Sequence, residues 1–221
     1  MTSVLPHIAL ESGNQPRHAI IWLHGLGADG QDFVPVVDEL KLPVPVRYIF
    51  PHAPRRPVTI NGGFVMRAWY DIAGTDIGAQ QDEAGIRTSQ TAVEALISQE
   101  IGRGIAPGNI FLAGFSQGGA VALHTALRQR ERLAGVLALS TYLPLSDTVA
   151  AEAQASAQQV PIFMAHGRSD PIVPYTLGTR SRDKLLALGY AVEWHEYPMQ
   201  HSVCEGELRA IESWLGKHLA A

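Results

Sequence analysis

Short apolar runs alternate with longer amphipathic runs along most of this chain, and this alternation restricts its fold more than any other feature. The apolar runs are rich in Ile, Val, Leu and Phe, and several lack polar alternation, which is typical of strands buried on both faces. They span His18–Leu23, Val46–Phe50, Asn109–Ala113, Gly135–Leu139, Pro161–Ala165 and Ala191–Glu196. Helical patterns occupy Gln31–Leu40, Asp82–Ile101, Gln117–Arg130, Thr176–Leu188 and Glu205–Leu219. This order predicts an α/β fold with a mostly parallel central sheet and helices on both faces.

Length and composition narrow the class of protein further. The 221 residues fit one α/β domain, so residues 1–221 are expected to form a single unit. The net charge of −4 gives no reason to expect nucleic acid or an anionic membrane as partner. No run reaches the roughly 18–20 apolar residues that span a bilayer, and residues 1–10 lack the pattern of a signal peptide. We therefore expect a cytoplasmic protein without stable membrane insertion.

A serine bounded by glycines lies between one predicted strand and the next helix. Residues 114–118 read Gly-Phe-Ser-Gln-Gly, which fits the G-x-S-x-G pattern of a nucleophile on a sharp strand-to-helix turn. Glycine two residues to either side removes side chains that would collide in so tight a turn. The start of the helix also directs backbone N–H groups towards the serine. Ser116 is therefore the predicted nucleophile.

An acid and a base follow in the order that such a serine requires, with Asp or Glu before His. Asp170 lies in the polar turn after the strand Pro161–Ala165, although an Asp before proline is also a common turn former. His201 begins the loop between the strand Ala191–Glu196 and the last helix. Its rival as base, His195, lies inside that strand pattern. We predict that Asp170 orients His201, and that His201 accepts the serine proton.

A second glycine-rich turn follows the first strand and has two interpretations. Residues 24–30 read His-Gly-Leu-Gly-Ala-Asp-Gly, which matches the G-x-G-x-x-G pattern of dinucleotide-binding proteins. That pattern expects an acidic residue about 20 positions later, but residues 48–52 read Tyr-Ile-Phe-Pro-His. The other interpretation is an oxyanion loop, in which the backbone N–H groups of Leu26 and Gln117 bind the developing oxyanion. It explains both glycine-rich turns, so we favour it.

Taken together, these motifs resemble the carboxylesterase and acyl-protein thioesterase (phospholipase/carboxylesterase) family of α/β-hydrolases. The matching segments are residues 24–30, 51–54, 59–63, 68–72 and 114–120, and His166, Gly167 and Asp170. Residues 139–144 look more like the bacterial carboxylesterase branch. The resemblance implies a triad of Ser116, Asp170 and His201 that hydrolyses short- to medium-chain carboxylic esters without a cofactor. Thioesters and lysophospholipids remain open as substrates. Gln200 departs from the family, which usually has glycine directly before this histidine, and the backbone angle there is in question.

The remaining expectations concern the substrate and other partners. The stretch Pro51–Thr75 reads as a long irregular loop, which in a compact domain is usually functional. Apolar residues here and in neighbouring loops are expected either to line an acyl groove or to pack into the core: Phe64, Met66, Trp69, Tyr142, Leu143 and Met199. No metal is expected, because neither the histidine spacings nor the single Cys204 fit a ligand motif. The expected partner is a small-molecule ester, and a homodimer through the loop face stays open. A binding protein on an inactive hydrolase scaffold is disfavoured by the ordered triad.

Overall fold

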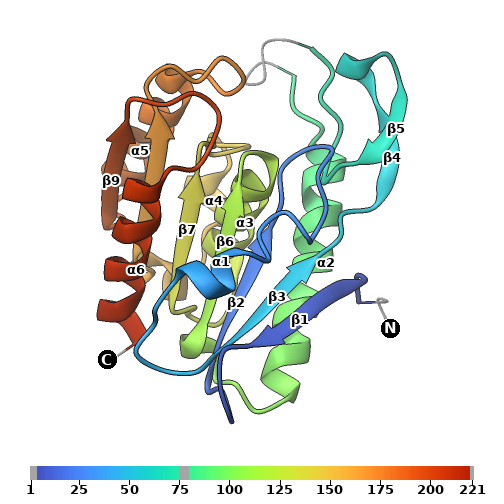
Figure 1. Cartoon of the computed structure of the whole chain (residues 1–221). Coiled ribbons are helices and arrows are strands. Elements are labelled where there is room, and N and C mark those ends of the chain that lie inside the picture. Colours follow the sequence, from blue (N-terminus) through green and yellow to red (C-terminus); the bar gives the residue numbers. More distant parts are fainter. Residues whose placement is uncertain (1–3, 75–79, 220–221) are drawn as a thin grey trace.

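The computed structural model describes residues 4–74 and 80–219. A seven-stranded sheet forms its centre, in the order β1-β3-β2-β6-β7-β8-β9 (Figure 1). The strands are β1 His7–Glu11, β2 His18–Leu23, β3 Val46–Pro51, β6 Ile110–Phe115, β7 Gly135–Leu139, β8 Ile162–Gly167 and β9 Val192–Tyr197. β1 pairs antiparallel with β3, and the other pairings in this sheet are parallel. The predicted α/β class with a mostly parallel sheet is therefore confirmed.

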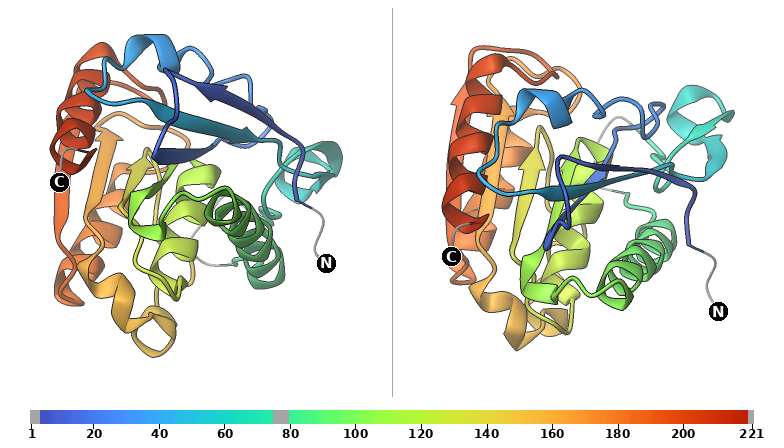
Figure 2. Two further views of the ribbon diagram at one scale, coloured as in Figure 1. Left: turned by 90° about the horizontal axis from the view of Figure 1, so that it is seen from below. Right: turned by 60° about the horizontal axis from the view of Figure 1, so that its bottom comes forward.

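Helices cover both faces of the sheet (Figure 2). One face carries α2 Glu83–Gly102, α3 Gln117–Arg128, α4 Val149–Glu152 and α5 Tyr175–Ala187, and the other carries α1 Val36–Glu39 and α6 Glu205–Leu219. Alternate residues of β2 belong to the two hydrophobic clusters. Ile21 lies in the cluster that contains α2 and α3, whereas Ile20 and Trp22 lie in the cluster that contains α1 and α6. This burial on both faces explains why the strands read as unbroken apolar runs.

The region before β3 is less helical than its pattern suggests. The expected helix over 31–40 is reduced to α1, and turns occupy the residues before it. Pro35 supplies the reason, because the residue before a proline is disfavoured in helical conformation. Residues 150–159 also break into the end of α4 and a 3₁₀ helix at Ala155–Gln159. Both segments therefore combine short helical pieces with turns.

The stretch predicted as an irregular loop over 51–75 contains a β-hairpin. Its last residue, Thr75, lies outside the described residues. Strands β4 Arg55–Val58 and β5 Phe64–Arg67 pair antiparallel and flank a 3₁₀ turn at Thr59–Asn61. Proline at position 57 concealed β4, because proline demotes a strand prediction. This hairpin stands beside the sheet, at the right of Figure 1. The loop prediction is wrong for these residues.

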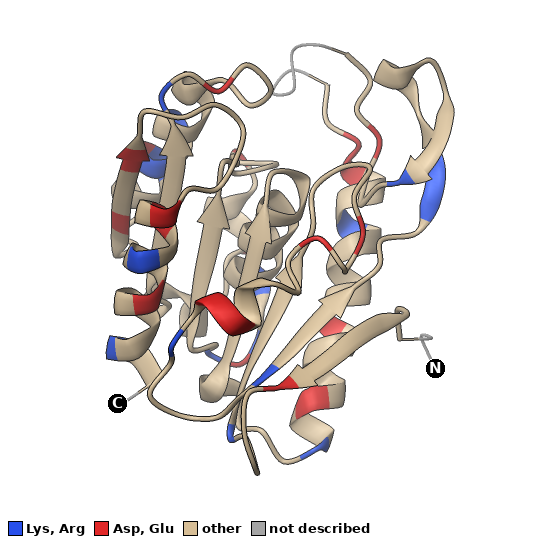
Figure 3. Ribbon diagram, in the orientation of Figure 1, with Lys and Arg blue, Asp and Glu red and all other residues tan. Residues whose placement is uncertain are grey.

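Charged side chains are distributed over the helices and edges of the molecule. In Figure 3 both signs occur on α2 and α6, whereas the carboxyl ends of β6 and β7 carry neither. Of the helices in the described ranges, none is long and apolar enough to cross a membrane. Ser116, the predicted nucleophile, directly follows the charge-free end of β6.

Candidate active site

Ser116 occupies the sharp turn between β6 and α3. Its backbone angles are φ 55° and ψ −122°, a conformation that costs a non-glycine residue about 1–3 kcal/mol. Two close approaches of the chain depend on the flanking glycines. A Cβ added at Gly114 would lie 2.4 Å from the carbonyl of Gly118, and one added at Gly118 would lie 2.3 Å from Leu23 O. The motif thus reflects steric necessity in this turn.

Hydrogen bonds with residues at and just after the end of β7 hold the strained turn in place. Ser116 N donates to Leu139 O at 2.9 Å, and the Thr141 hydroxyl donates to Ser116 O at 2.6 Å. Ala120 N also donates to Ser116 O, which begins α3. Because both the N–H and the C=O of Ser116 are hydrogen-bonded to this neighbouring segment, tertiary contacts as well as the local sequence hold the serine conformation.

Asp170 and His201 form a direct pair at the carboxyl ends of β8 and β9. His201 Nδ1 lies 2.7 Å from Asp170 Oδ2, and the Asp170 side chain is fully buried. The other oxygen, Oδ1, accepts from the backbone N–H groups of Ile172 at 2.8 Å and Val173 at 2.9 Å. Burial acts to raise the pKa of Asp170, but the hydrogen bonds from His201 and the two backbone groups outweigh it and lower the pKa. The carboxyl group is therefore held ionised against the imidazole.

The loops that carry this pair interlock with each other and approach the serine turn. Ser169 N donates to Met199 O at 3.1 Å, and a Cβ added at Gly167 would lie 2.3 Å from Gln200 O. The ring of His201 packs on Phe115, with centroids 4.6 Å apart. Ser116 and His201 make no direct hydrogen bond here, so the structure shows the Asp170–His201 contact and places His201 against Phe115, the residue before the serine.

Gln200 raises no strain at the position where the family usually has glycine. In the described parts of the chain, the non-glycine residues with positive φ are Gln15, Ser116, Ser140 and Leu145. Gln200 is not among them, so it does not adopt the positive φ that would favour glycine. The departure from the family pattern therefore requires no left-handed backbone at this position.

The glycine-rich turn after β2 lies against the serine turn. A Cβ added at Gly25 would be 3.5 Å from Ser116 Cβ, and Leu26 is the next residue along the chain from Gly25. Gly27, with φ 79°, donates its N–H to Arg67 O at 2.9 Å. Gly30 has no room for a side chain, because a Cβ there would lie 2.4 Å from Phe50 O. These glycines therefore allow the turn to pack closely against the serine turn, β3 and β5.

The side chain of Gln117 has a structural task that the sequence did not reveal. Its Oε1 accepts from Trp69 N at 2.8 Å, and its Nε2 donates to Tyr70 O at 2.8 Å. The indole N–H of Trp69 donates to His24 O at 2.9 Å. The residue after the nucleophile thus ties the segment at 69–70 to the serine turn. Only its backbone N–H was predicted to matter.

The six residues predicted for an acyl groove divide into two groups. Phe64 is 74% exposed, and Met66 and Met199 are half-buried. Trp69 has no exposed surface, and Tyr142 and Leu143 are also buried. The Tyr142 hydroxyl hydrogen-bonds that of Tyr70 at 2.8 Å. For the second group the core alternative fits, since these side chains offer almost no surface to a ligand.

Other histidines serve structural contacts. His195, the rival base, lies on β9 with Nε2 2.9 Å from Glu193 Oε1, and its ring stacks on Phe163 at 4.8 Å. Burial lowers the pKa of His24, which keeps it neutral between Gly25 O and the N–H of Ala53. Over residues 4–74 and 80–219, no three His, Cys, Asp or Glu side chains gather as metal ligands would.

Comparison with known proteins places the chain in a class and then in a family. A strand-to-helix turn with a serine, at the carboxyl edge of a mostly parallel sheet, characterises α/β-hydrolase serine enzymes. The family profile described as phospholipase/carboxylesterase matches residues 6–219. The chain belongs to this family and is a serine hydrolase.

Two kinds of relative illustrate the similarity. Acyl-protein thioesterase 1 of Neurospora crassa is 44% identical, over 92% of this chain and 88% of its own. The crystal structure of Arabidopsis thaliana SOBER1 superposes with a TM-score of 0.86 at 34% identity, covering 91% of this chain and 99% of that one. Zea mays acyl-protein thioesterase 2 gives a TM-score of 0.85 at 30% identity, covering 97% and 99%.

Proposed function

We propose that this chain hydrolyses acyl esters and thioesters with Ser116 as nucleophile, His201 as general base and Asp170 as the carboxylate that orients the base. The observation that carries the proposal is the 2.7 Å contact between His201 Nδ1 and Asp170 Oδ2, beside the strained serine turn. Since the ionised Asp170 carboxylate can only accept, His201 Nδ1 carries the hydrogen and donates it to Oδ2. Nε2 is then free to accept a proton.

The first half of the reaction forms an acyl-enzyme. Ser116 Oγ attacks the carbonyl carbon of the substrate while His201 Nε2 takes the hydroxyl proton. The backbone N–H groups of Leu26 and Gln117 donate hydrogen bonds to the negative charge that develops on the carbonyl oxygen. The bond to the leaving group then breaks, and His201 delivers the proton to the departing alcohol or thiol.

The second half returns the enzyme to its starting state. Water attacks the acyl carbon of the Ser116 ester, and His201 Nε2 removes a proton from that water. Collapse of the tetrahedral intermediate releases the carboxylic acid, and the proton returns to Ser116 Oγ. Asp170 stabilises the imidazolium in both halves without itself being protonated.

The proposed substrates are carboxylic esters with short to medium acyl chains, and thioesters. We include thioesters among the proposed substrates because the similar proteins from Neurospora crassa and Cryptococcus neoformans are named acyl-protein thioesterases. Phe64, Met66 and Met199 offer the apolar surface that an acyl chain needs. The chemistry at Ser116 is the same for both leaving groups, so the acyl chain and the group beyond it set the preference.

The test combines covalent labelling with turnover. We expect a fluorophosphonate to modify Ser116, as read by peptide mass spectrometry, and hydrolysis of a butyrate ester and a butyryl thioester to stop in parallel. Ser116→Ala should lower kcat by at least about 10³-fold. Ser140→Ala is the matched control, because this buried serine directly follows β7, and the variant should still be labelled at Ser116. An adduct elsewhere, or turnover retained by Ser116→Ala, contradicts the proposal.

A further inference from the structure

A second histidine lies against the Asp170 carboxylate. His166, in β8, is fully buried, and its Nε2 lies 2.9 Å from Val173 O and 3.5 Å from Asp170 Oδ2. Since a carbonyl oxygen can only accept, Nε2 must carry the hydrogen. This N–H therefore donates to Val173 O, and Asp170 Oδ2 lies 3.5 Å from the same nitrogen.

The charge state of His166 follows from its other nitrogen. Nδ1 is buried and has no hydrogen-bond partner in the described parts of the chain. An imidazolium would place an N–H there without an acceptor, which is costly in a buried site. Burial also lowers the pKa of His166. The ring is thus neutral and has a single N–H, directed at the turn that carries Asp170.

The turn at 170–173 is closed by this contact. Val173 donates its N–H to Asp170 Oδ1 at 2.9 Å, and its carbonyl accepts from His166. Val173 thereby links the Asp170 carboxylate to His166 in β8. Asp170 Oδ2 then remains directed at His201.

The walls around the His166 ring leave it little freedom to move. A Cβ added at Gly178 in α5 would lie 2.5 Å from Nδ1 and 2.8 Å from Cε1. Trp194 lies nearly parallel to the ring, at 6.2 Å and 20°, and Tyr175 approaches it edge-on at 6.1 Å. α5 and β9 therefore hold the ring from separate sides.

We infer that His166 is a positioning residue, which holds Asp170 on His201 through the carbonyl of Val173. The inference rests on the proposed function of the Asp170–His201 pair. His166 touches neither the substrate nor the reacting atoms. It acts by keeping the carboxylate in a single orientation while His201 gains and loses its proton.

The principal variants remove or preserve the donor. His166→Met deletes the N–H and keeps much of the volume, whereas His166→Gln retains an N–H near the Nε2 position. We expect His166→Met to lower kcat for a butyrate ester by about 10- to 100-fold, with KM within about twofold. Gln should recover most of the loss. The acid limb of the kcat/KM profile should move to lower pH in His166→Met, because a loosely held carboxylate stabilises protonated His201 less.

A control and a second variant keep the test decisive. His124→Met removes another fully buried neutral histidine, in α3, which contacts Gln90 rather than Asp170. It should lower Tm without moving the pH profile. Gly178→Ala leaves His166 in the chain but displaces its ring, and should reproduce the kinetic defect even where His166→Met does not fold. The low-field proton resonance of the Asp170–His201 hydrogen bond should shift in both.

Three outcomes separate failure of this inference from failure of the proposed function. Full turnover in Ser116→Ala would refute the proposed triad, and with it the proposed function. If Ser116→Ala is inactive while Gly178→Ala, and His166→Met where it folds, keep wild-type kcat and pH profile, the positioning role is wrong. A loss in His166→Met that simply follows Tm, as in His124→Met, would equally overturn it.

Discussion

At the scale of single residues, the main departure from local rules outside the active site is Glu207. It lies fully buried on the face of α6 that otherwise carries Ile211, Trp214, Leu215 and Leu219. Among the described residues neither carboxyl oxygen has a partner in good hydrogen-bond geometry, although the backbone of Cys204 is near enough to act on the group. Burial raises the pKa of Glu207 from 4.5 to about 8, although the backbone of Cys204 acts in the opposite direction. The folded protein therefore holds this group protonated near neutral pH.

The pH dependence of stability follows from that difference. The unfolded chain releases the Glu207 proton above about pH 4.5, and the folded chain keeps it until about pH 8. The stabilisation from the protonated group is thus complete below pH 4.5 and is lost as pH rises towards 8. We expect Glu207→Gln to raise the free energy of unfolding by about 2–3 kcal/mol at pH 7 and by little at pH 4. Urea denaturation at both values measures it, and an equal effect at both would refute it.

Gly118 shows how one position can depend on space alone. An added Cβ would lie 2.3 Å from Leu23 O and 2.5 Å from His24 O, and both are backbone atoms that no rotamer change can move. We expect Gly118→Ala to destabilise the protein by about 3 kcal/mol or more, as read by thermal unfolding. Gly216→Ala in α6 is the matched control, because nothing lies within 4 Å of its added Cβ. It should stabilise by up to about 1 kcal/mol. Similar Tm values for the two variants would show that the turn can relax.

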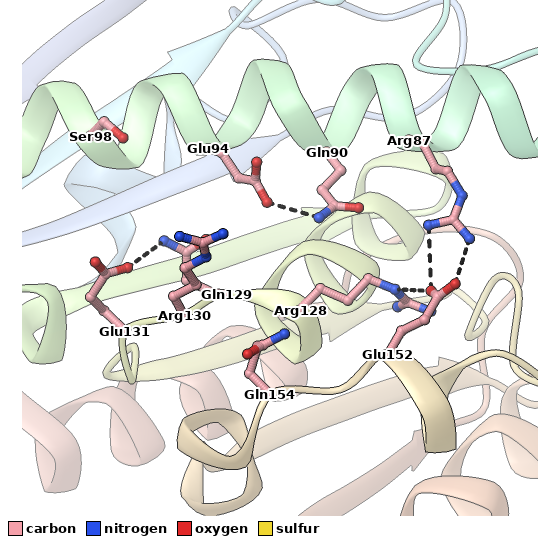
Figure 4. A pocket seen from close by; sticks show the side chains of 10 residues that line it. All are labelled: Arg87, Gln90, Glu94, Ser98, Arg128, Gln129, Arg130, Glu131, Glu152 and Gln154. Atoms are coloured by element: carbon pink, nitrogen blue, oxygen red, sulfur yellow. Dashed lines mark hydrogen bonds and ion pairs between the residues drawn. The ribbon is translucent and has the colours of Figure 1, made fainter.

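At the scale of elements, an ion-pair network joins three helices on one face of the sheet. Glu152 of α4 accepts from Arg87 of α2 and Arg128 of α3, each at 2.7 Å, as the dashed lines in Figure 4 show. They line a polar surface pocket together with Gln90, Glu94 and Gln129 (Figure 4). The Arg128 side chain is only 5% exposed, whereas that of Arg87 is 38% exposed. The two pairs therefore differ in how strongly water screens them.

A double-mutant cycle should resolve this difference. We expect a coupling energy of about 1–2 kcal/mol between Arg128 and Glu152, and below about 1 kcal/mol between Arg87 and Glu152. Hydrogen bonds from Arg87 and Arg128 lower the pKa of Glu152 to about 2. The coupling should therefore be complete above about pH 4.5 and disappear as pH falls towards 2. Chemical denaturation of the four proteins in each cycle provides the values. Equal couplings would mean that burial of Arg128 is irrelevant.

At the scale of the whole molecule, the sheet brings together groups that are distant in the chain. Ser116, Asp170 and His201 each follow a strand of the central sheet, and parallel strands end at the same edge. The strands were predictable because their residues are buried on both faces and read as apolar runs. The hairpin β4–β5 and the edge strand β1 were not, since one contains proline and the other is half exposed.

The amino-acid sequence alone determined the fold class, the serine turn and the order of the predicted acid and base. These depend on local rules, namely which side chains are apolar and where a Cβ has no room. Tertiary structure decided the burial of Trp69, the contacts of the Gln117 side chain, the backbone conformation of Gln200 and the contact of His166 with Val173. Each depends on where distant parts of the chain settle in the folded protein, as in the bond between Trp69 and Gln117, 48 residues apart. No local pattern encodes such a meeting, because its energy arises only when the packed sheet and helices bring both groups together.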